Sequence, residues 1–336
     1  MEKILYIGNK LEKHGQSPTS ADILPELFRI EGLDVLVFSA KKNKVLRFLD
    51  ITSHILKHAP SSKFVLIDTY STLNFWIAVW SGFLCFLLRL NYVTILRGGN
   101  LSYRLRNNKN TSKFLFSNSY KNIIPSKFLY EQFHTHGIPN LEYIPNNIDI
   151  NKYPFLKRLS PTPKLLWVRA FAEIYNPKMA ILVLERVLKN YPEAELCMVG
   201  PEKDGSLKAA KKLAQEKGLP VSFTGKLDKK DWIKLSKEYD IFVNTTNIDN
   251  TPVTVMEALA LGLPVVSTNV GGLPYLIKNN ITGILVEPAN ILAMASGIER
   301  LIEDRRLAEN LSYNGRKYVE KFDWKKVKAL WMELLR

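Results

Sequence analysis

Short, nearly continuous apolar runs alternate along the chain with segments whose apolar residues recur at helical spacing. Phe64–Asp68 and Tyr92–Leu96 consist almost entirely of aliphatic and aromatic residues, as do strands that are buried on both faces of a parallel sheet. Between such runs, Lys44–His58 has apolar positions three and four residues apart, which indicates an amphipathic helix. The alternation predicts an α/β protein built on parallel sheets.

The same rhythm occurs twice, once on each side of a proline-rich and polar stretch at 149–163 that we interpret as an interdomain linker. In the first series we expect strands at Lys3–Gly8, Asp34–Ser39, Phe64–Asp68, Tyr92–Leu96 and Ile123–Ser126, and helices at Thr19–Glu31, Lys44–His58, Leu73–Leu88 and Lys127–His136. In the second we expect strands at Lys164–Val168, Glu195–Val199, Val221–Phe223, Ile241–Asn244 and Pro264–Ser267, and helices at Pro177–Asn190, Leu207–Lys217, Asp231–Tyr239, Pro252–Leu261 and Leu273–Lys278.

This pattern predicts two Rossmann-like domains in tandem. We place the first at 1–155 and the second at 156–324. In two-lobed folds the last helix often crosses back to the first domain, so we treat 325–336 as a segment of that kind. A length of 336 residues agrees with about two domains.

Composition and charge narrow the class of protein. With 46% hydrophobic and 24% charged residues, the chain is an ordinary globular protein rather than a disordered or fibrous one. Its two cysteines, Cys85 and Cys197, are far apart in the sequence, which excludes a disulfide framework and favours a reducing compartment.

The net charge of +15 is spread over both halves, with 19 Lys and Arg against 11 Asp and Glu in residues 1–155, and 28 against 21 in the remainder. Because no nucleic-acid-binding signature accompanies the charge, we expect no nucleic-acid partner. An anionic membrane surface fits the basic balance at least as well.

Two segments bear on localisation. The apolar run Ile4–Gly8 is too short for a signal peptide, so we expect a cytoplasmic protein. Residues 69–88 have no charge and contain Phe75, Trp76, Trp80 and two further phenylalanines. We interpret this segment as a helix that is either buried in the first domain or lies on a membrane surface, rather than as a membrane span.

The most informative stretch begins where the strand at Ile241–Asn244 ends. A polar loop follows, and Pro252 stands where a helix can begin, because proline has no N–H to lose there. The amides of Val253 and Thr254 in the first helical turn would then point free N–H groups at an anion. The sequence therefore predicts a phosphate site.

Residues 244–266, followed by Gly271 and Gly272, resemble the nucleotide-sugar motif of the retaining family 4 glycosyltransferases. The resemblance implies the GT-B fold, in which two Rossmann-like domains face each other across a cleft. It also implies that Glu257 binds the ribose of a nucleotide and that Asp249, eight residues earlier, contacts the transferred sugar. The family usually has Glu where this chain has Asp249.

A second similar segment is 165–171, where Arg169 occupies the position of a family arginine that stabilises the diphosphate of the donor. The family lysine five residues later is absent, because residue 174 is Ile. Lys178 is either the substitute cation or a surface lysine in a first helical turn. The resemblance also assigns Gly225, Lys226 and Leu227 to the loop that contacts the nucleotide base.

In the first domain, Gly8 follows the first strand, and Arg97, Gly98 and Gly99 follow another. Loops at the carboxyl ends of parallel strands bind ligands, so we count these four residues as candidate donor or acceptor contacts. Arg97 either faces an anionic ligand or is a hydrogen-bonded arginine at a strand end.

The resemblance as a whole implies a retaining glycosyltransferase that uses a nucleoside-diphosphate sugar as donor and a saccharide or lipid-linked saccharide as acceptor, in surface polysaccharide or glycolipid synthesis. We expect no metal and no cofactor, since no D-x-D cluster is placed to hold a divalent ion on the diphosphate. The alternatives are a sugar-nucleotide epimerase and a catalytically silent subunit that binds sugar nucleotides. The donor base, the sugar and the acceptor are not encoded by these motifs.

Overall fold

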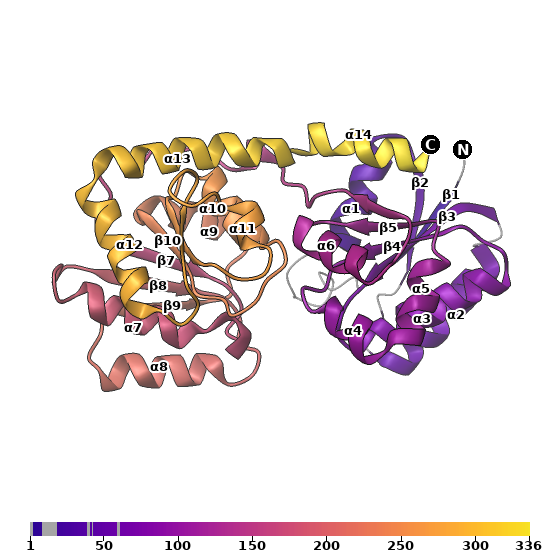
Figure 1. Ribbon diagram of the computed structural model, residues 1–336, viewed down its shortest axis with the longest axis horizontal. Helices are drawn as coiled ribbons and strands as arrows, with labels where there is room; N and C mark the ends of the chain where they lie inside the picture. Colours follow the sequence, from indigo (N-terminus) through magenta and orange to yellow (C-terminus); the bar gives the residue numbers. More distant parts are fainter. Residues whose placement is uncertain (1–2, 9–18, 39–40, 42, 59–60) are drawn as a thin grey trace. The chain divides into compact units, whose positions relative to one another are not determined.

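The computed structural model describes residues 3–8, 19–38, 41, 43–58 and 61–336 (Figure 1). By its internal contacts the chain divides into two compact units. Unit 1 consists of Met1–Pro145 together with Trp331–Arg336, and unit 2 of Asn146–Leu330. Each contains one six-stranded sheet in which every paired strand is parallel, so the α/β class and the two Rossmann-like units are confirmed.

The sheet of unit 1 has the strand order β2-β1-β3-β4-β5-β6. Its strands are β1 (Lys3–Ile7), β2 (Asp34–Phe38), β3 (Ser62–Thr69), β4 (Tyr92–Leu96), β5 (Lys121–Ile124) and β6 (Leu141–Tyr143). Its helices are α1 (Ser20–Ile30), α2 (Lys44–His58), α3 (Asn74–Leu87), α4 (Leu101–Asn107), α5 (Lys109–Ser117) and α6 (Lys127–Thr135). Helices α2, α3 and α5 cover the face of the sheet opposite to α1 (Figure 1).

The order of strands creates a reversal point between β1 and β3, because the chain leaves β1 toward β2 and leaves β3 toward β4. Loops diverge at such a point, and their divergence leaves room beyond the carboxyl ends of the two strands. Gly8 follows β1 there, and Asp68 lies near the end of β3. The strands themselves are buried on both faces, as their apolar runs predict; Leu5 and Val65 have no exposed surface.

Unit 2 has the order β12-β11-β10-β7-β8-β9. Its strands are β7 (Lys164–Val168), β8 (Glu195–Val199), β9 (Val221–Gly225), β10 (Ile241–Asn244), β11 (Val265–Thr268) and β12 (Ile284–Val286). Its helices are α7 (Pro177–Val187), α8 (Ser206–Glu216), α9 (Lys229–Leu235), α10 (Val253–Ala260), α11 (Leu273–Leu276), α12 (Ile291–Glu303) and α13 (Arg305–Val319). Here the reversal point lies between β7 and β10, which places the segments after these strands next to each other.

The polar segment at 149–163 is not a free linker but is packed on unit 2. The amide of Leu156 donates to the carbonyl of Leu261 at 3.1 Å. Arg158 is 4% exposed, and its guanidinium donates to the backbone carbonyls of Ser236 and Tyr239 at 2.8 and 3.0 Å. Because these contacts fix the segment, the boundary between the units falls at 145/146 rather than at the composition change near 155.

The uncharged segment forms α3, a helix of 14 residues. One side of it, which includes Phe75 and Cys85, is buried against the sheet, whereas Trp76, Phe83 and Phe86 are exposed. The helix is therefore buried on one side, as the first alternative predicts, and exposed on the other. In the part of the chain that the structure describes, no helix has the length and apolarity needed to cross a membrane.

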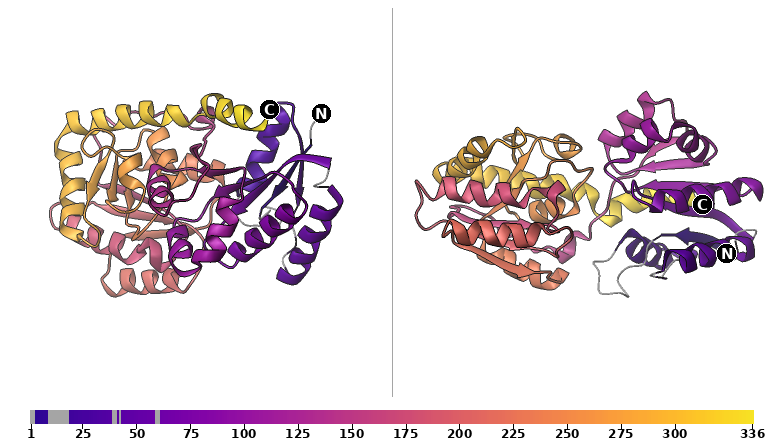
Figure 2. Two further views of the ribbon diagram at one scale, coloured as in Figure 1. Left: turned by 45° about the vertical axis from the view of Figure 1, so that its right-hand side comes forward. Right: turned by 90° about the horizontal axis from the view of Figure 1, so that it is seen from below.

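The last helix, α14 (Trp324–Leu335), begins in unit 2 and ends in unit 1 (Figure 2). Trp331 is 2% exposed, and its ring packs edge-on against Phe28 of α1 with 5.3 Å between ring centroids. The side chain of Lys63 also donates to the carbonyl of Arg336. The end of α14 is thus part of the packing of unit 1.

We expect Trp331→Ala to destabilise unit 1, because removing a large buried aromatic side chain costs about 3–5 kcal/mol. Leu330→Ala is the matched control, since Leu330 lies on the same helix and is exposed. Urea unfolding of both variants, compared with the unchanged chain, measures the difference. Equal midpoints for the two variants would contradict the packing role of Trp331.

Candidate active site

The candidate site in unit 2 is built at the carboxyl ends of two neighbouring strands. Arg169 is the first residue after β7, and residues 245–252 form the loop between β10 and α10. Because β7 pairs with β10 in parallel, these two segments leave the sheet at the same edge. The sequence motifs that were singled out separately therefore meet in space.

Arg169 is the centre of this group of contacts. Its guanidinium forms an ion pair with the carboxylate of Asp249 and donates to Oγ1 of Thr254 at 3.4 Å. Its guanidinium carbon lies 4.0 Å from the centre of the Tyr175 ring. The Nε–H of Arg169 is buried, and among the described residues it has no hydrogen-bond partner. One donor of this cation is thus left for a ligand.

Two glycines allow the Asp249 loop to take its position. The amide of Gly272 donates to the carbonyl of Asp249 at 2.9 Å. A Cβ on Gly271, whose φ is +55°, would lie 2.1 Å from that carbonyl oxygen, and a Cβ on Gly272 would lie 1.6 Å from the carbonyl oxygen of Asn250. Both approaches are backbone contacts that no side chain can relieve, so the glycine pair is required by the shape of the loop.

Helix α10 begins at Val253, one residue later than its expected start, and Pro252 is its N-cap. The amides of Val253 and Thr254 lie in the first turn, where N–H groups have no acceptor within the helix. They carry the positive end of the helix dipole. The structure therefore puts a helix N-terminus, a favourable place for an anion, beside the Arg169 guanidinium.

Glu257 lies further along α10 and is only 1% exposed. Its Oε1 accepts a hydrogen bond from the hydroxyl of Tyr153 at 2.7 Å and also pairs with the ammonium of Lys229. Its Oε2 is buried without a partner among the described residues. Burial and the neighbouring carboxylate raise the pKa of Tyr153, so this hydroxyl stays protonated and donates to Glu257.

Tyr153, Tyr175 and Lys229 were not found by sequence reasoning. Tyr153 comes from the segment interpreted as a linker, and Lys229 from the first turn of α9. Tyr175 follows Arg169 closely in the chain, and its aromatic ring near a candidate arginine is the one sequence signal that could have found it. The other two contact Glu257 from distant positions, which no local spacing encodes.

The end of β9 and the loop after it contain the three residues assigned to base binding. Gly225 has a φ of +72°, and its carbonyl accepts from the amide of Gly200 at 2.8 Å. Lys226 is exposed, whereas Leu227 packs on the core that surrounds Glu257. The loop leaves the same edge of the sheet as Arg169 and runs directly into α9, which carries Lys229.

Lys178 is the candidate that the structure does not bring into this group. It lies in the first turn of α7 with an exposed side chain. Within the described residues, no ion pair involves Lys178. The Tyr175 ring, which lies three residues before Lys178 in the chain, contacts Arg169. The position of Lys178 agrees with the surface-lysine alternative as well as with a ligand contact.

In unit 1, Arg97 donates through Nε to Oδ1 of Asp68 at 3.3 Å, and the Tyr6 hydroxyl donates to the same oxygen at 2.9 Å. Burial raises the pKa of Asp68, and the charge of Arg97 offsets part of that rise. Arg97 thus follows the alternative of a strand-end arginine held by its neighbours. The sequence singled out Arg97 but missed the buried carboxylate that pairs with it.

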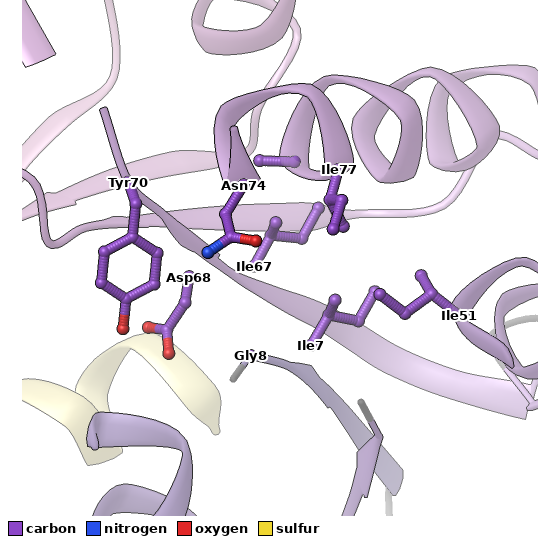
Figure 3. A pocket seen from close by; sticks show the side chains of 9 residues that line it. Ile7, Gly8, Ile51, Ile67, Asp68, Tyr70, Asn74 and Ile77 are labelled. Atoms are coloured by element: carbon purple, nitrogen blue, oxygen red, sulfur yellow. The ribbon is translucent and has the colours of Figure 1, made fainter. Parts of the chain in front are cut away.

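Oδ2 of Asp68 has no partner among the described residues and faces a small cavity (Figure 3). Tyr70 and Asn74 lie on its polar side, and isoleucines including Ile51 form the apolar side. The cavity volume of about 10 Å³ is enough for roughly one water or one ligand hydroxyl. A Cβ on Gly8 would lie 2.6 Å from Oδ2 of Asp68, so only a glycine fits beside this carboxylate.

The backbone also comes close at the other glycines of this edge. Gly98 and Gly99 follow Arg97 and precede α4, and a Cβ on Gly98 would lie 2.6 Å from the amide nitrogen of Ser71.

Across the residues that the structure describes, no three His, Cys, Asp or Glu side chains come together in a way that could hold a metal ion.

Comparison with known proteins identifies the family to which the chain belongs. The profile of the family "Glycosyl transferases group 1" matches residues 151–318, which contain the whole candidate site of unit 2. The chain belongs to this family.

Individual relatives agree with the family. The chain is 31% identical over 147 residues to a sulfoquinovosyl transferase of Arabidopsis thaliana, which covers 43% of this chain and 28% of that protein. It is 26% identical over 196 residues to a glycogen synthase of Mycobacterium tuberculosis, which covers 57% and 47% of the two chains. The matches therefore span less than half the length of these relatives.

Solved structures show the fold of the whole chain. Sucrose-phosphate synthase from Thermosynechococcus elongatus superposes with a TM-score of 0.80 at 17% identity and covers 99% of this chain and 98% of its own. HepE of Anabaena, in complex with UDP-glucose, superposes with a TM-score of 0.78 at 18% identity and covers 100% and 99%. The fold is GT-B, as the sequence motif predicts.

We expect Tyr153→Phe to lower the free energy of unfolding by about 1.5–3 kcal/mol, because the variant removes a buried hydrogen bond to a charged group. Tyr313→Phe makes the same chemical change at an exposed position of unit 2 and serves as control. Thermal and urea unfolding measure both. If the two variants unfold alike, the Tyr153 hydroxyl does not hold Glu257.

Proposed function

We propose that the protein is a retaining, metal-independent glycosyltransferase that moves a sugar from a nucleoside-diphosphate sugar to a saccharide or lipid-linked saccharide. One observation carries the proposal. Two buried polar atoms have no partner among the described residues: the Nε–H donor of Arg169, which lies beside the start of α10, and the acceptor Oε2 of Glu257 within α10. Each unpaired group costs about 1–3 kcal/mol, and a ligand with both an anion and hydroxyl groups would satisfy them.

A nucleoside diphosphate has this combination of groups. Its ribose hydroxyl would donate to Oε2 of Glu257, and its diphosphate would accept from Arg169 and from the amides of Val253 and Thr254. The loop Gly225–Leu227 would contact the base. HepE of Anabaena, a protein of the same fold, is solved in complex with UDP-glucose, which supports a nucleoside-diphosphate sugar as the ligand.

The transfer is proposed to proceed on one face of the sugar. The bond between the anomeric carbon and the β-phosphate oxygen breaks, and the electron pair stays on the phosphate. The acceptor oxygen forms its bond to the same face of that carbon, and its proton passes to the β-phosphate. The charge that develops on the phosphate is stabilised by Arg169 and the helix terminus, so arginine supplies the positive charge at the diphosphate.

Asp249 has two roles in this proposal. Its carboxylate fixes the Arg169 guanidinium, and its position in the loop is held by the glycine pair. By resemblance to the family it also contacts the transferred sugar. The Asp249 side chain is shorter than the usual glutamate, which gives a reason for a donor sugar different from that of glutamate-containing relatives.

The acceptor is proposed to be a saccharide of a surface polysaccharide or a glycolipid. A sulfoquinovosyl transferase among the relatives is consistent with this class. In unit 1 the hydroxyl-sized cavity at Asp68 is suited to an acceptor hydroxyl. Cys85 and Cys197, both buried free thiols, are consistent with the cytoplasm, where nucleotide sugars are made.

Incubation of the protein with UDP-, GDP- and ADP-sugars, with and without saccharide acceptors, tests the function. We expect one donor class to stabilise the protein in thermal unfolding, by about 2.7 kcal/mol at 100 times its dissociation constant. With an acceptor present, NMR of the product should show the anomeric configuration of the donor. An isomerised donor would identify an epimerase, and binding without turnover would identify a silent subunit.

Arg169→Ala is expected to lower kcat about 10²–10³-fold, because it removes a donor aimed at the developing phosphate charge. Arg306→Ala removes an exposed arginine of α13 and serves as control. Steady-state kinetics with the donor found above measures both variants. Near-normal turnover of a folded Arg169→Ala protein would contradict its assignment to the diphosphate.

A further inference from the structure

Unit 1 has an apolar surface formed by α2 and α3, with α5 beside them. On α3 the exposed aromatic side chains are Trp76 at 45%, Phe83 at 37% and Phe86 at 49%. Ring contacts join the helices: Phe48 of α2 lies 5.2 Å from Trp80, and Phe114 of α5 lies 5.4 Å from Phe86. We call this surface the aromatic face. It is a contiguous row of rings rather than scattered apolar residues.

The aromatic face arises from the spacing of the apolar residues along α3. Along α3, positions 76, 80, 83 and 87 form one stripe, and all four are Trp, Phe or Leu. A second stripe, at 75, 78, 82 and 85, is buried against the sheet. A helix that covers a sheet needs only the second stripe to be apolar. In the outer stripe Trp80 is partly buried and donates to Oγ1 of Thr52 on α2. Trp76, Phe83 and Leu87 are exposed, so the packing of unit 1 leaves most of this stripe open to solvent.

Further residues of α2 and at the two ends of α3 extend the apolar area. The additional exposed side chains are Val45, Leu46, Leu49, Leu56, Leu73, Leu87 and Leu88. Contiguous exposed apolar areas of this kind mark contacts with a partner protein or with a membrane.

The charge of the surrounding chain distinguishes between these partners. Residues 69–130, which include all of α3, α4 and α5, contain eight Lys and Arg and no Asp or Glu. Several of the cations border the aromatic face. The guanidinium carbon of Arg104 lies 5.9 Å from the centre of the Trp76 ring, exposed Arg89 follows α3, and exposed Lys113 precedes Phe114. The one acidic residue of α2, Asp50, faces His54 on the same helix.

We propose that the aromatic face docks on the surface of an anionic lipid bilayer. Rings and aliphatic side chains would insert at the boundary of headgroups and acyl chains, and the bordering cations would bind lipid phosphates. A second copy of the chain would bring like charges together, which disfavours it as the occupant. The proposal concerns a surface of unit 1 and does not depend on the chemistry proposed for unit 2.

Co-sedimentation with lipid vesicles tests the proposal, and it needs neither donor nor acceptor. We expect the protein to sediment with vesicles of phosphatidylcholine and phosphatidylglycerol at low salt, less at high salt, and little with phosphatidylcholine alone. The triple variant Trp76→Ser, Phe83→Ser, Phe86→Ser should bind the vesicles at least about tenfold more weakly than the unchanged chain. Arg89→Gln with Lys113→Gln should weaken binding and reduce its salt dependence.

The matched control is Leu292→Ser with Tyr313→Ser, which removes exposed apolar side chains from unit 2 and should bind vesicles as the unchanged chain does. Because all the replaced residues are solvent-accessible, unfolding curves should show that each variant is folded.

Three results would overturn the proposal. The unchanged protein could stay in the supernatant with anionic vesicles at low salt, or the triple variant could bind as well as the control. Alternatively, size-exclusion chromatography could show a dimer that the triple variant converts to monomer, which would assign the face to a second copy. A failure of lipid binding with intact glycosyl transfer would leave the proposed function in place.

Discussion

The ion pair between Arg169 and Asp249 is the interaction on which the rest of unit 2's site depends. It joins the first residue after β7 to the loop after β10, and Arg169 extends it to Thr254 at the start of α10. Removing one partner of a buried pair leaves an uncompensated charge at a cost of about 3–5 kcal/mol. The backbone approach of Gly271 and Gly272 is what allows Asp249 to reach this position.

Unit 1 contains a similar arginine–aspartate ion pair, in which the carboxylate is more deeply buried. Arg97 follows β4 and pairs with Asp68 of the adjacent strand β3. In unit 2, Arg169 follows β7 and pairs with Asp249 from the loop after the neighbouring strand β10. In unit 1 the carboxylate lies within the strand and has no exposed side-chain surface. In each pair one buried atom remains unpaired, a carboxylate oxygen at Asp68 and an N–H at Arg169. The unpaired atoms of the two pairs thus have opposite polarities, an acceptor in unit 1 and a donor in unit 2.

The hydrophobic pattern predicted the main elements because buried parallel strands and amphipathic helices have strong periods; α2, β4, β7 and β10 have the expected bounds. Helix α4 was missed because Leu101–Asn107 is short and largely polar, and β12 has only three residues. The motif residues of unit 2 were found because they are local in sequence. Tyr153 and Asp68 were not, because their partners lie more than 25 residues away.

The way α14 is divided has a consequence for how the chain acquires its structure during synthesis. Phe28 of α1 is covered by Trp331, which leaves the ribosome only after every residue of unit 2. Domains generally fold as units in the order of their synthesis, but here the first domain stays unfinished until the second is complete. For that interval an apolar patch of α1 is open to chaperones or to misassembly, and it closes only when the final turns of the last helix arrive.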